Sequence, residues 1–253
     1  MISIKSEHEL QKMRQASRIV AQVLAGLRER AKPGVLTASL DAWAERFIRQ
    51  HGGIPSFKGY RGYPASVCIS LDSEIVHGIP GRRRLREGQI VSMDVGVIYK
   101  GYHGDATITV GVGQISPAAA QLLAVTQEAL AAGIAAALAG RRLGDVSHAI
   151  QVVAENRGYG VVRDYVGHGI GKEMHEDPPI PNFGQPGCGP LLRPGMTLAL
   201  EPMVTIGDYR TRVLDDMWTV VTADGSLAAH FEHTIAVTNG EPEVLTHLDQ
   251  AGD

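Results

Sequence analysis

Six residues with metal-binding or proton-transferring side chains occur in the same order in two halves of this 253-residue sequence. The first half supplies His77, Asp94 and Asp105, and the second supplies His168, Glu201 and Glu232. Imidazole nitrogens and carboxylate oxygens bind divalent metal ions and also act as acids and bases. If the two halves meet, two histidines and four carboxylates converge on one site.

The segments around these residues repeat in order. His77-Gly78-Ile79 returns as His168-Gly169-Ile170, the segment from Arg86 to Asp94 returns from Arg193 to Glu201, and the segment from Asp105 to Val110 returns from Glu232 to Val237. One such match arises easily by chance, whereas three in order indicate an internal duplication. The simplest interpretation is two related halves about an approximate two-fold axis, with matching residues meeting at the centre.

Two of the acids lie within or directly after apolar stretches of the sequence. Asp94 lies inside the apolar run from Ile90 to Ile98, Glu201 follows Leu198-Ala199-Leu200, and neither segment contains Lys or Arg. A buried carboxylate is costly unless it is paired or bound to metal, and two divalent cations would neutralise four neighbouring acids. An oxygen-rich set with some imidazole favours manganese, iron, cobalt or a catalytic zinc pair. Because such a pair activates water and stabilises an oxyanion, hydrolysis is the predicted chemistry.

Each of these residues also has a structural interpretation. Asp94 alone in a strand is typical of a hydrogen-bonded structural acid, Glu232 beside His233 is typical of an ion pair, and His77 is typical of a turn cap. The joint repetition favours metal binding for a set of five residues, namely Asp94, Asp105, His168, Glu201 and Glu232. His77 fits this set less well as a direct ligand.

The elements that must position these residues follow the same repeat. In the first half, Ser6 and Glu9 form a capping box before a helix that ends at Pro33-Gly34, and a second helix from about Leu40 to Ile48 stops at Gly52-Gly53. Strands are expected around residues 66–70, 74–77, 90–99 and 102–112.

The second half restarts this order of elements. Ser116-Pro117 opens a third helix that ends near Gly140, Asp145 caps a fourth that stops at Gly158, and strands follow. We therefore predict an α+β chain that forms one domain over residues 1–253, with halves of about 6–112 and 116–240. Helix-helix-strand units would place the helices on one face of a curved, mainly antiparallel sheet.

Composition excludes several classes of protein. A hydrophobic content of 44% permits a sizeable core, and a net charge of −3 argues against DNA binding. The first residues show no basic region followed by an apolar run, so we expect no leader peptide, and we expect no stretch that approaches the length of a membrane span. The two cysteines, Cys68 and Cys188, form no Cys-x-x-Cys motif, so we expect a cytoplasmic protein with free thiols.

Other motifs are weaker. The glycines from Gly167 to Gly171 suggest a dinucleotide loop, but the prolines from Pro178 to Pro181 follow where that loop needs a helix. The basic run from Arg82 to Arg86 is either a solvated turn or a contact with ribosomal RNA.

Across nearly its whole length the sequence resembles the methionine aminopeptidases. The first half carries Tyr60-Arg61-Gly62-Tyr63-Pro64-Ala65-Ser66-Val67-Cys68, His77-Gly78-Ile79-Pro80, Asp94 and His103-Gly104-Asp105. The second half carries Gly167-His168-Gly169-Ile170-Gly171, Met174-His175-Glu176-Asp177-Pro178, Glu201-Pro202 and Phe231-Glu232-His233-Thr234. The short interval between His168 and Glu201 is similar to the type I branch, because the type II branch carries a helical insertion there.

The resemblance implies the pita-bread fold and removal of the initiator methionine from nascent proteins whose second residue is small. It implies that Asp94 and Asp105 bind one metal ion, that His168 and Glu201 bind the other, and that Asp105 and Glu232 bridge the two. The identity of the metal, whether cobalt, manganese, iron or zinc, stays open.

The resemblance also assigns roles around the metal ions. It implies that Glu201 handles the proton of the attacking water, and that His77 and His175 contact the substrate and steady the tetrahedral intermediate. From its neighbours alone, His175 could equally be a surface histidine beside acids. The residues implied to line the methionine pocket are Tyr60, Tyr63, Cys68 and Trp218.

Three positions depart from the family pattern. Asp72 stands where Asn is frequent and Ala228 where Ser is frequent, which argues against the family's monovalent-cation site. Met174 replaces a residue that is often aromatic, and we expect it to alter the rim of the cleft.

Two rival functions share this pattern. Prolidase and aminopeptidase P have the same fold and ligands, but they carry a long N-terminal domain that we do not expect here. A catalytically dead module that binds peptides would have lost ligands, whereas all five are present. We expect a monomer that acts on nascent polypeptide N-termini, with transient ribosome contact and no DNA or membrane partner.

Overall fold

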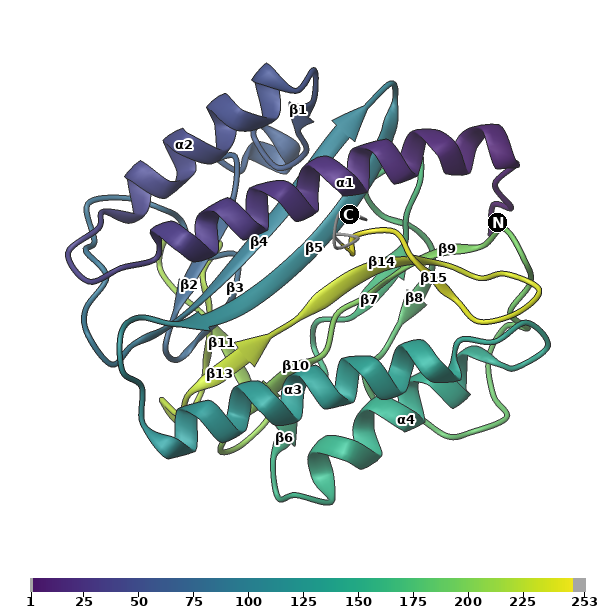
Figure 1. Ribbon diagram of the computed structural model, residues 1–253. Coiled ribbons are helices and arrows are strands. Elements are labelled where there is room, and N and C mark those ends of the chain that lie inside the picture. The colour runs from purple at the N-terminus through teal and green to yellow at the C-terminus, as the bar shows by residue number, and fades with distance from the viewer. Residues whose placement is uncertain (1, 248–253) are drawn as a thin grey trace, which may run out of the picture.

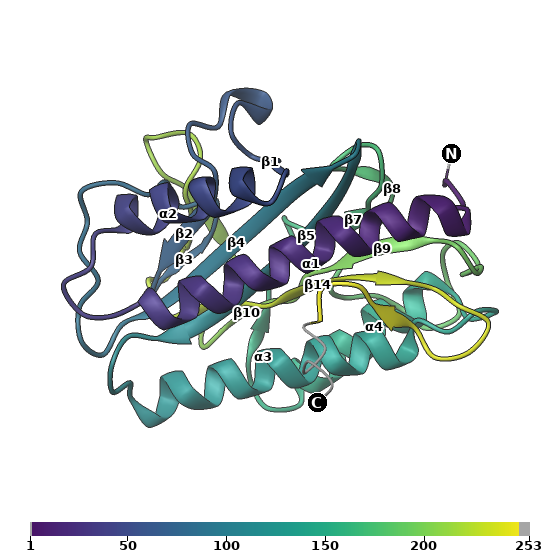
Figure 2. The same cartoon turned by 45° about the horizontal axis from the view of Figure 1, so that its top comes forward.

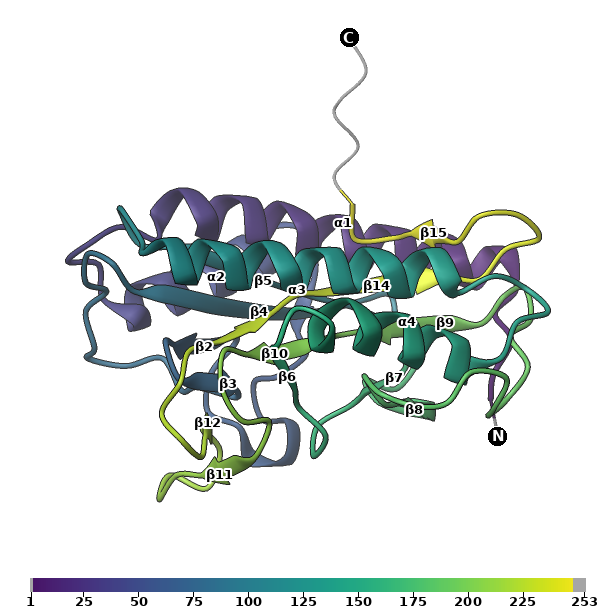
Figure 3. The same cartoon turned by 90° about the horizontal axis from the view of Figure 1, so that it is seen from below.

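The computed structural model describes residues 2–247, in which four α-helices cover one face of a curved nine-stranded sheet (Figure 1, Figure 3). The helices are α1 (Glu7–Arg30), α2 (Thr37–Gln50), α3 (Pro117–Ala136) and α4 (Leu143–Glu155), with a 3-10 turn at Tyr60–Gly62. The strands of the first half are β1 (Ile54–Pro55), β2 (Cys68–Leu71), β3 (Glu74–Val76), β4 (Ile90–Tyr99) and β5 (Tyr102–Gly111). Those of the second half are β6 (Gly160–Val161), β7 (Gly167–Gly169), β8 (Glu176–Ile180), β9 (Thr197–Leu200), β10 (Met203–Thr205), β11 (Thr211–Val213), β12 (Val220–Thr222), β13 (Ala228–His230), β14 (Glu232–Ala236) and β15 (Glu243–Val244).

The main sheet has the order β1-β4-β5-β14-β9-β7-β8, with β2 paired to β4 and β15 paired to β14, and all its pairs are antiparallel. The pairing of β5 with β14, in which Thr107 lies opposite Glu232, joins the two halves. On either side of this seam stand β4 and β9, the strands that the repeat relates. The predicted antiparallel pita-bread architecture is therefore confirmed.

Each half has its own hydrophobic core under its own helices. One core joins α1 and α2 to β4 through residues such as Leu24 and Val95, and the other joins α3 and α4 to β9 through residues such as Leu122 and Leu198. Helices α1 and α3 lie across the same face of the sheet, on either side of β14 (Figure 1, Figure 2). No α-helix of the described residues covers the opposite face of the main sheet.

The starts of the helices agree with the capping signals in the sequence, except at α4. The Ser6 hydroxyl accepts the Glu9 backbone N–H while the Glu9 carboxylate accepts the Ser6 N–H, as the capping box predicts. Asp145 is not the cap of α4. It is the third residue of the helix, in the first turn, where its carboxylate accepts the backbone N–H groups of Arg142 and Gly187 at 2.9 and 2.7 Å.

Helix α3 corrects a second expectation. By length and composition alone it is apolar enough to cross a membrane. Its inner face is buried, with Leu122, Val125 and Ala129 completely enclosed in the core that it shares with α4. A core helix of a globular fold passes the same test, so this helix is only weak evidence for a membrane span.

Candidate metal centre

The five predicted ligands come from five neighbouring strands of the main sheet. Asp94 lies on β4, Asp105 on β5, Glu232 at the start of β14, Glu201 directly after β9 and His168 on β7. Because side chains alternate along a strand, the register sets which of them share a face. Thr107 lies opposite both Asp94 and Glu232, and its hydroxyl donates to Glu232 Oε2 at 2.9 Å. The sheet itself therefore brings these residues together.

The donor atoms are close enough to share a cation. Ligand atoms of Asp105, His168 and Glu232 all lie within 4.8 Å of one another, and His168 Nε2 lies 3.6 Å from Glu201 Oε1. Three carboxylate oxygens, Asp94 Oδ1, Asp105 Oδ1 and Glu232 Oε1, are buried without a hydrogen-bond partner among residues 2–247. Buried polar atoms rarely stay unpaired. These oxygens and this donor set fit divalent metal ions.

Burial and mutual repulsion make the acids hold protons when no cation neutralises them. Burial raises the pKa of Asp94 to about 7. Burial and the charge of neighbouring carboxylates raise the pKa of Asp105, Glu201 and Glu232 well above the usual range. Such shifts cluster at functional sites, because structural acids usually keep a cationic or hydrogen-bonding partner.

His168 is held in the form that binds metal. Its Nδ1 lies 2.8 Å from the Gly169 carbonyl oxygen, which accepts only, so Nδ1 carries the proton. Nε2 then presents a lone pair to the acids. Burial lowers the pKa of His168 to about 3, which keeps the ring neutral. A backbone carbonyl on the far nitrogen is the usual support of a metal-binding histidine.

The acids open into a cavity of about 150 Å³ that all the sequence-predicted site residues line. The predicted pocket residues that line it are Tyr60, Tyr63, Cys68 and Trp218. Tyr63 packs edge-on against Trp218 with ring centroids 5.1 Å apart, and its hydroxyl donates to the Gly78 carbonyl at 2.8 Å. Cys68 lies opposite Asp94 in the β2–β4 pairing. Burial and the Asp94 charge raise the pKa of the Cys68 thiol, so it remains an uncharged wall of the pocket.

Two histidines lie at the mouth of the acid cluster. His175 stacks on Tyr60, and its Nδ1 lies 2.9 Å from the Tyr60 hydroxyl. Its ring centroid is 4.2 Å from that of His168. His77, which follows β3, faces Trp218 and Tyr165 edge-on. Burial lowers the pKa of His77 to about 4 and also lowers that of His175. Both rings are therefore neutral donors or acceptors near neutral pH.

Sequence reasoning missed several residues of the cavity. Phe57 and Arg61 also line it. Met174 is 3% exposed and packs with Phe57, Tyr63 and Cys68, so it forms a wall of the pocket and not the rim.

His230 was missed as well, although the repeat contains a signal for it. His230 precedes Glu232 by the same interval as His103 precedes Asp105, so the duplicated segment extends further than the sequence analysis took it. His230 is buried with its Nε2 3.6 Å from Glu201 Oε2.

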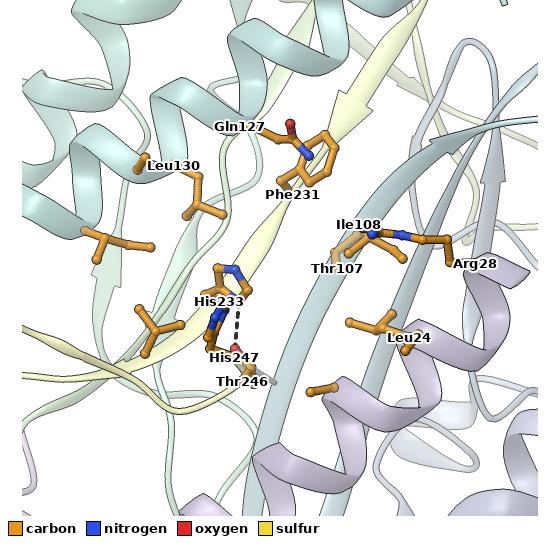
Figure 4. A pocket seen from close by; sticks show the side chains of 15 residues that line it. Leu24, Arg28, Thr107, Ile108, Gln127, Leu130, Phe231, His233, Thr246 and His247 are labelled. Atoms are coloured by element: carbon orange, nitrogen blue, oxygen red, sulfur yellow. Dashed lines mark hydrogen bonds between the residues drawn. The ribbon is translucent and has the colours of Figure 1, made fainter. Parts of the chain in front are cut away.

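The alternative of a Glu232–His233 ion pair does not hold. These neighbours point to opposite faces of β14, and His233 Nδ1 lies 2.8 Å from Thr246 Oγ1. His233 lines a separate cavity of about 470 Å³ between α1 and α3, on the face that the helices cover (Figure 4). No Asp or Glu within the described range lines that cavity, so it lacks a metal-binding acid set.

The departures at Asp72 and Ala228 lie next to each other. The Ala228 backbone N–H donates to the Asp72 carbonyl at 2.9 Å. The Asp72 carboxylate accepts the Gln89 side-chain amide at 2.6 Å and the Ile90 backbone N–H at 3.0 Å. Both of its oxygens are thus used within the protein.

Comparison with known proteins agrees with this site. The model of metallopeptidase family M24 matches residues 11–239. The chain is 56% identical over 247 residues to the methionine aminopeptidase of Clostridium acetobutylicum, covering 97% of this chain and 99% of that protein. It is 52% identical over 248 residues to methionine aminopeptidase 1 of Bacillus subtilis, covering 98% and 100%.

Solved structures give the same result. The methionine aminopeptidase of Thermotoga maritima superposes with a TM-score of 0.97 at 47% identity, covering 98% of this chain and all of that one. A prolidase from Pyrococcus furiosus shares the fold, with a TM-score of 0.80 at 22% identity, but this chain covers only 66% of it.

Proposed function

Because the chain belongs to metallopeptidase family M24, we propose that its acid cluster holds two divalent metal ions for the hydrolysis of a peptide bond. The activity is that of a methionine aminopeptidase, which removes an N-terminal initiator methionine when the second residue is small. The observation that carries this proposal is the single cavity that joins the acid cluster to a pocket of aromatic and sulfur-containing side chains.

The proposed ligands are Asp94 and Asp105 for one ion, His168 and Glu201 for the other, and Asp105 and Glu232 as bridges. The unpartnered oxygens of Asp94, Asp105 and Glu232 and the free lone pair of His168 support this assignment. Two divalent cations supply a water of lowered pKa and stabilisation of negative charge on the peptide carbonyl oxygen. Reconstitution with manganese, iron, cobalt or zinc determines which of these metals supports the activity.

The protein's own residues orient the substrate and move the proton. In this proposal Glu201 takes the proton of the attacking water at a carboxylate oxygen and passes it to the departing amine. His175 donates from Nε2 to the carbonyl oxygen, because Tyr60 occupies Nδ1. His77 also lines the cavity and contacts the substrate in this proposal.

Specificity for methionine follows from the pocket. Tyr60, Tyr63 and Trp218 present aromatic rings, which make favourable contacts with a thioether. Cys68 and Met174 complete an uncharged wall. A flexible, polarizable side chain fills such an irregular space better than a branched one does.

The proposal is tested by peptide cleavage after reconstitution. Metal-free protein is loaded separately with manganese, iron, cobalt or zinc, and assayed on Met-Ala-Ser, Leu-Ala-Ser and Xaa-Pro peptides. We expect cleavage of Met-Ala-Ser with two bound ions per chain. Comparable cleavage of Leu-Ala-Ser, or a preference for Xaa-Pro, would reject methionine specificity.

We further propose that the substrates are nascent chains at the ribosome and that a groove of arginines contacts ribosomal RNA. The charged residues that line this arginine groove, about 1150 Å³, are five arginines and three acids, namely Arg82, Arg83, Arg84, Arg86, Arg212, Asp72, Glu74 and Asp224. Arg83 pairs with Glu74, whereas Arg82, Arg86 and Arg212 make no ion pair within residues 2–247. Unpaired guanidinium groups bind phosphate bidentately.

Cosedimentation with ribosomes at two salt concentrations tests this surface. Arg82→Ala/Arg212→Ala should weaken ribosome binding and flatten its salt dependence, since each lost phosphate contact lowers the slope. Arg18→Ala/Arg46→Ala removes the same charge from exposed helix positions and should bind like the parent. Equal binding by both double variants would refute the arginine groove as the contact.

We also propose a monomer in the cytoplasm, without DNA or membrane partners. The five proposed ligands and the four proposed pocket residues all belong to this chain, so the proposed chemistry calls for no residue from a second copy. The free thiols of Cys68 and Cys188 suit a reducing compartment. The net charge of −3 does not favour DNA.

A further inference from the structure

His230 ends β13, directly before the strand that carries Glu232. Its side chain is 3% exposed, and its Nε2 is buried with no hydrogen-bond partner in the described part of the chain. An orphaned imidazole nitrogen in a core is costly unless it serves a neighbour. Its nearest charged neighbour is Glu201, whose Oε2 lies 3.6 Å from Nε2.

The Glu201 carboxylate lies between two imidazoles. His168 Nε2 is 3.6 Å from Oε1, and His230 Nε2 is the same distance from Oε2. Among residues 2–247 no side chain forms a hydrogen bond to this carboxylate, and the two imidazoles are its closest polar side-chain contacts. The main chain of Glu201 is fixed by Asn182, whose amide donates to the Glu201 carbonyl at 3.0 Å. The carboxylate itself therefore depends on these two rings for its orientation.

The backbone of His230 is held firmly in place. The Thr109 hydroxyl on β5 accepts the His230 N–H at 2.9 Å and donates to the His230 carbonyl at 2.7 Å. Ser92 Oγ lies 2.8 Å from the same Thr109 oxygen. Since Thr109 is anchored in the sheet beside the acids, His230 is fixed relative to the cluster.

The geometry distinguishes a donor from a further metal ligand. A lone pair of Nε2 aimed at a carboxylate oxygen would be repelled, whereas an N–H would be attracted. The 3.6 Å separation exceeds a formed hydrogen bond, and a small rotation of either side chain closes it.

We propose that His230 is a positioning residue for Glu201, with its Nε2–H directed at Oε2 so that Oε1 faces the metal ion and the nucleophile. This inference rests on the proposed function of Glu201 as a metal ligand. Partners that orient a ligand in this way typically contribute 10- to 100-fold to metal affinity or activity.

Cobalt titration of the metal-free protein tests the role directly. His230→Leu removes the donor at similar volume and should weaken cobalt binding at one of the two sites about 10- to 100-fold. It should also change the visible cobalt absorption and lower kcat more than it changes KM. His230→Gln keeps an N–H donor and should remain close to the parent in cobalt affinity.

His233→Leu is the matched control. It changes the same residue type on the adjoining strand, but its ring points into the cavity between α1 and α3 (Figure 4). Both cobalt affinities should match those of the parent. A melting temperature for each variant separates loss of fold from loss of binding, and if His230→Leu unfolds, the comparison of His230→Gln with the shorter His230→Asn decides the question.

A double-mutant cycle isolates the pair. In a Glu201→Ala background, His230→Leu should have no further effect on cobalt affinity, because its partner is gone. An undiminished effect in that background, or parental cobalt binding by His230→Leu, would overturn the proposal. If the parent protein itself fails to bind two ions or to cleave Met-Ala-Ser, the proposed function fails first, and the two failures are distinguishable.

Discussion

Asp105 is the residue whose loss reports most directly on the dinuclear assignment. It lies on the central strand β5, is 3% exposed, and has one oxygen without a partner in the described chain. If it bridges two ions, Asp105→Ala should release both and lower activity on the order of 10³-fold, since a major source of charge stabilisation goes with them. Metal analysis after gel filtration measures the content. Two tightly bound ions in this variant would contradict bridging, and Glu128→Ala, an exposed acid, serves as control.

The hydrogen bond between His175 and Tyr60 leads to two predictions, a large effect for one substitution and a small effect for the other. We propose that the Tyr60 hydroxyl, 2.9 Å from Nδ1, donates to it, which leaves the proton of the neutral ring on Nε2, the nitrogen that must face the developing oxyanion. His175→Ala should lower kcat about 10²- to 10³-fold with both ions retained. Tyr60→Phe should lose about 1 kcal/mol, roughly fivefold, because the ring stays while its tautomer is no longer fixed.

Steady-state kinetics on Met-Ala-Ser with parallel metal analysis tests this pair. A His175→Ala variant within about threefold of the parent would make His175 a bystander. A Tyr60→Phe variant as poor as His175→Ala would instead place Tyr60 in direct contact with the reacting groups.

At the scale of residues, the sequence predicted those site residues that recur in both of its halves. The four acids and one histidine of the centre stand out because matching residues occur in both halves, and all five line one cavity in the structure. Met174 and Phe57 have no such mark, because an apolar pocket residue looks like any core residue until its neighbours are known. His230 shows that matching positions in the repeat can differ in their contacts. Its counterpart His103 has a hydrogen bond with Ser56, whereas His230 Nε2 has no hydrogen-bond partner among the described residues.

At the scale of elements, the loop between β7 and β8 is held by an ion pair from the N-terminal segment. Lys5, 8% exposed, reaches Glu176 Oε2 at 2.5 Å. Glu176 Oε1 accepts the backbone N–H groups of Lys172 and Glu173 at 2.8 and 3.3 Å. This loop carries His175, so an interaction outside the cavity sets the position of a proposed catalytic donor.

Lys5→Met should therefore destabilise the protein and lower kcat together. Removing the lysine leaves the partly buried Glu176 carboxylate with hydrogen bonds from Ser3 and the backbone but without its cation, which costs about 1–3 kcal/mol. We expect kcat to fall and metal content to stay, since none of the proposed ligands lies on this loop. Denaturant unfolding and kinetics measure the two effects. Lys172→Met, an exposed lysine on the same loop, should change stability by less than about 0.5 kcal/mol.

The element boundaries show why local signals were only partly sufficient. Ser6 and Ser116 were recognised as caps because their signature is local in sequence. Asp145 carries the same type of signal, yet α4 begins earlier. Arg142 forms an isolated β-bridge with Leu191, and the Asp145 carboxylate also accepts the backbone N–H of Gly187. Both contacts are with residues far along the chain. The apolar length of α3 reflects burial between α4 and the sheet. Tertiary contacts of this kind are absent from a local pattern.

At the scale of the whole molecule, the metal centre lies on the seam between the halves. The order β4-β5-β14-β9 places one acid from each of four strands at the centre, two from each half. We propose that the halves unfold as one domain, because the sheet runs through both and the cluster needs both. The duplication that the sequence reveals is thus also the reason why neither half can carry the site alone.

Above neutral pH, stability should depend on pH in the metal-free protein but not in the metal-loaded protein. The metal-free protein holds protons on Asp94, whose pKa is raised to about 7, and on Asp105, Glu201 and Glu232, whose pKa values are raised further. An unfolded chain has released these protons above pH 5. The folded state therefore binds more protons, and the free energy of unfolding falls as pH rises. Below about pH 6.5 the buried histidines, whose pKa values are lowered, act in the opposite direction, since they stay neutral while unfolded histidine gains a proton.

The effect of the acids on stability can therefore be measured separately from that of the histidines between pH 7.5 and 8.5, where histidine in the unfolded chain is almost neutral. Each proton still held by the folded cluster lowers the free energy of unfolding by about 1.4 kcal/mol over one pH unit. For a chain of this size, this corresponds to a fall of roughly 3–5 °C in the melting temperature. Loaded protein should show no such fall, because the cations replace the protons. Calorimetry of chelator-treated and manganese-loaded protein, each expected to unfold in a single transition, measures the difference. A melting temperature of the metal-free protein that stays constant or rises across this window would mean that the carboxylates are already ionised, and that their charges are balanced by groups other than bound metal.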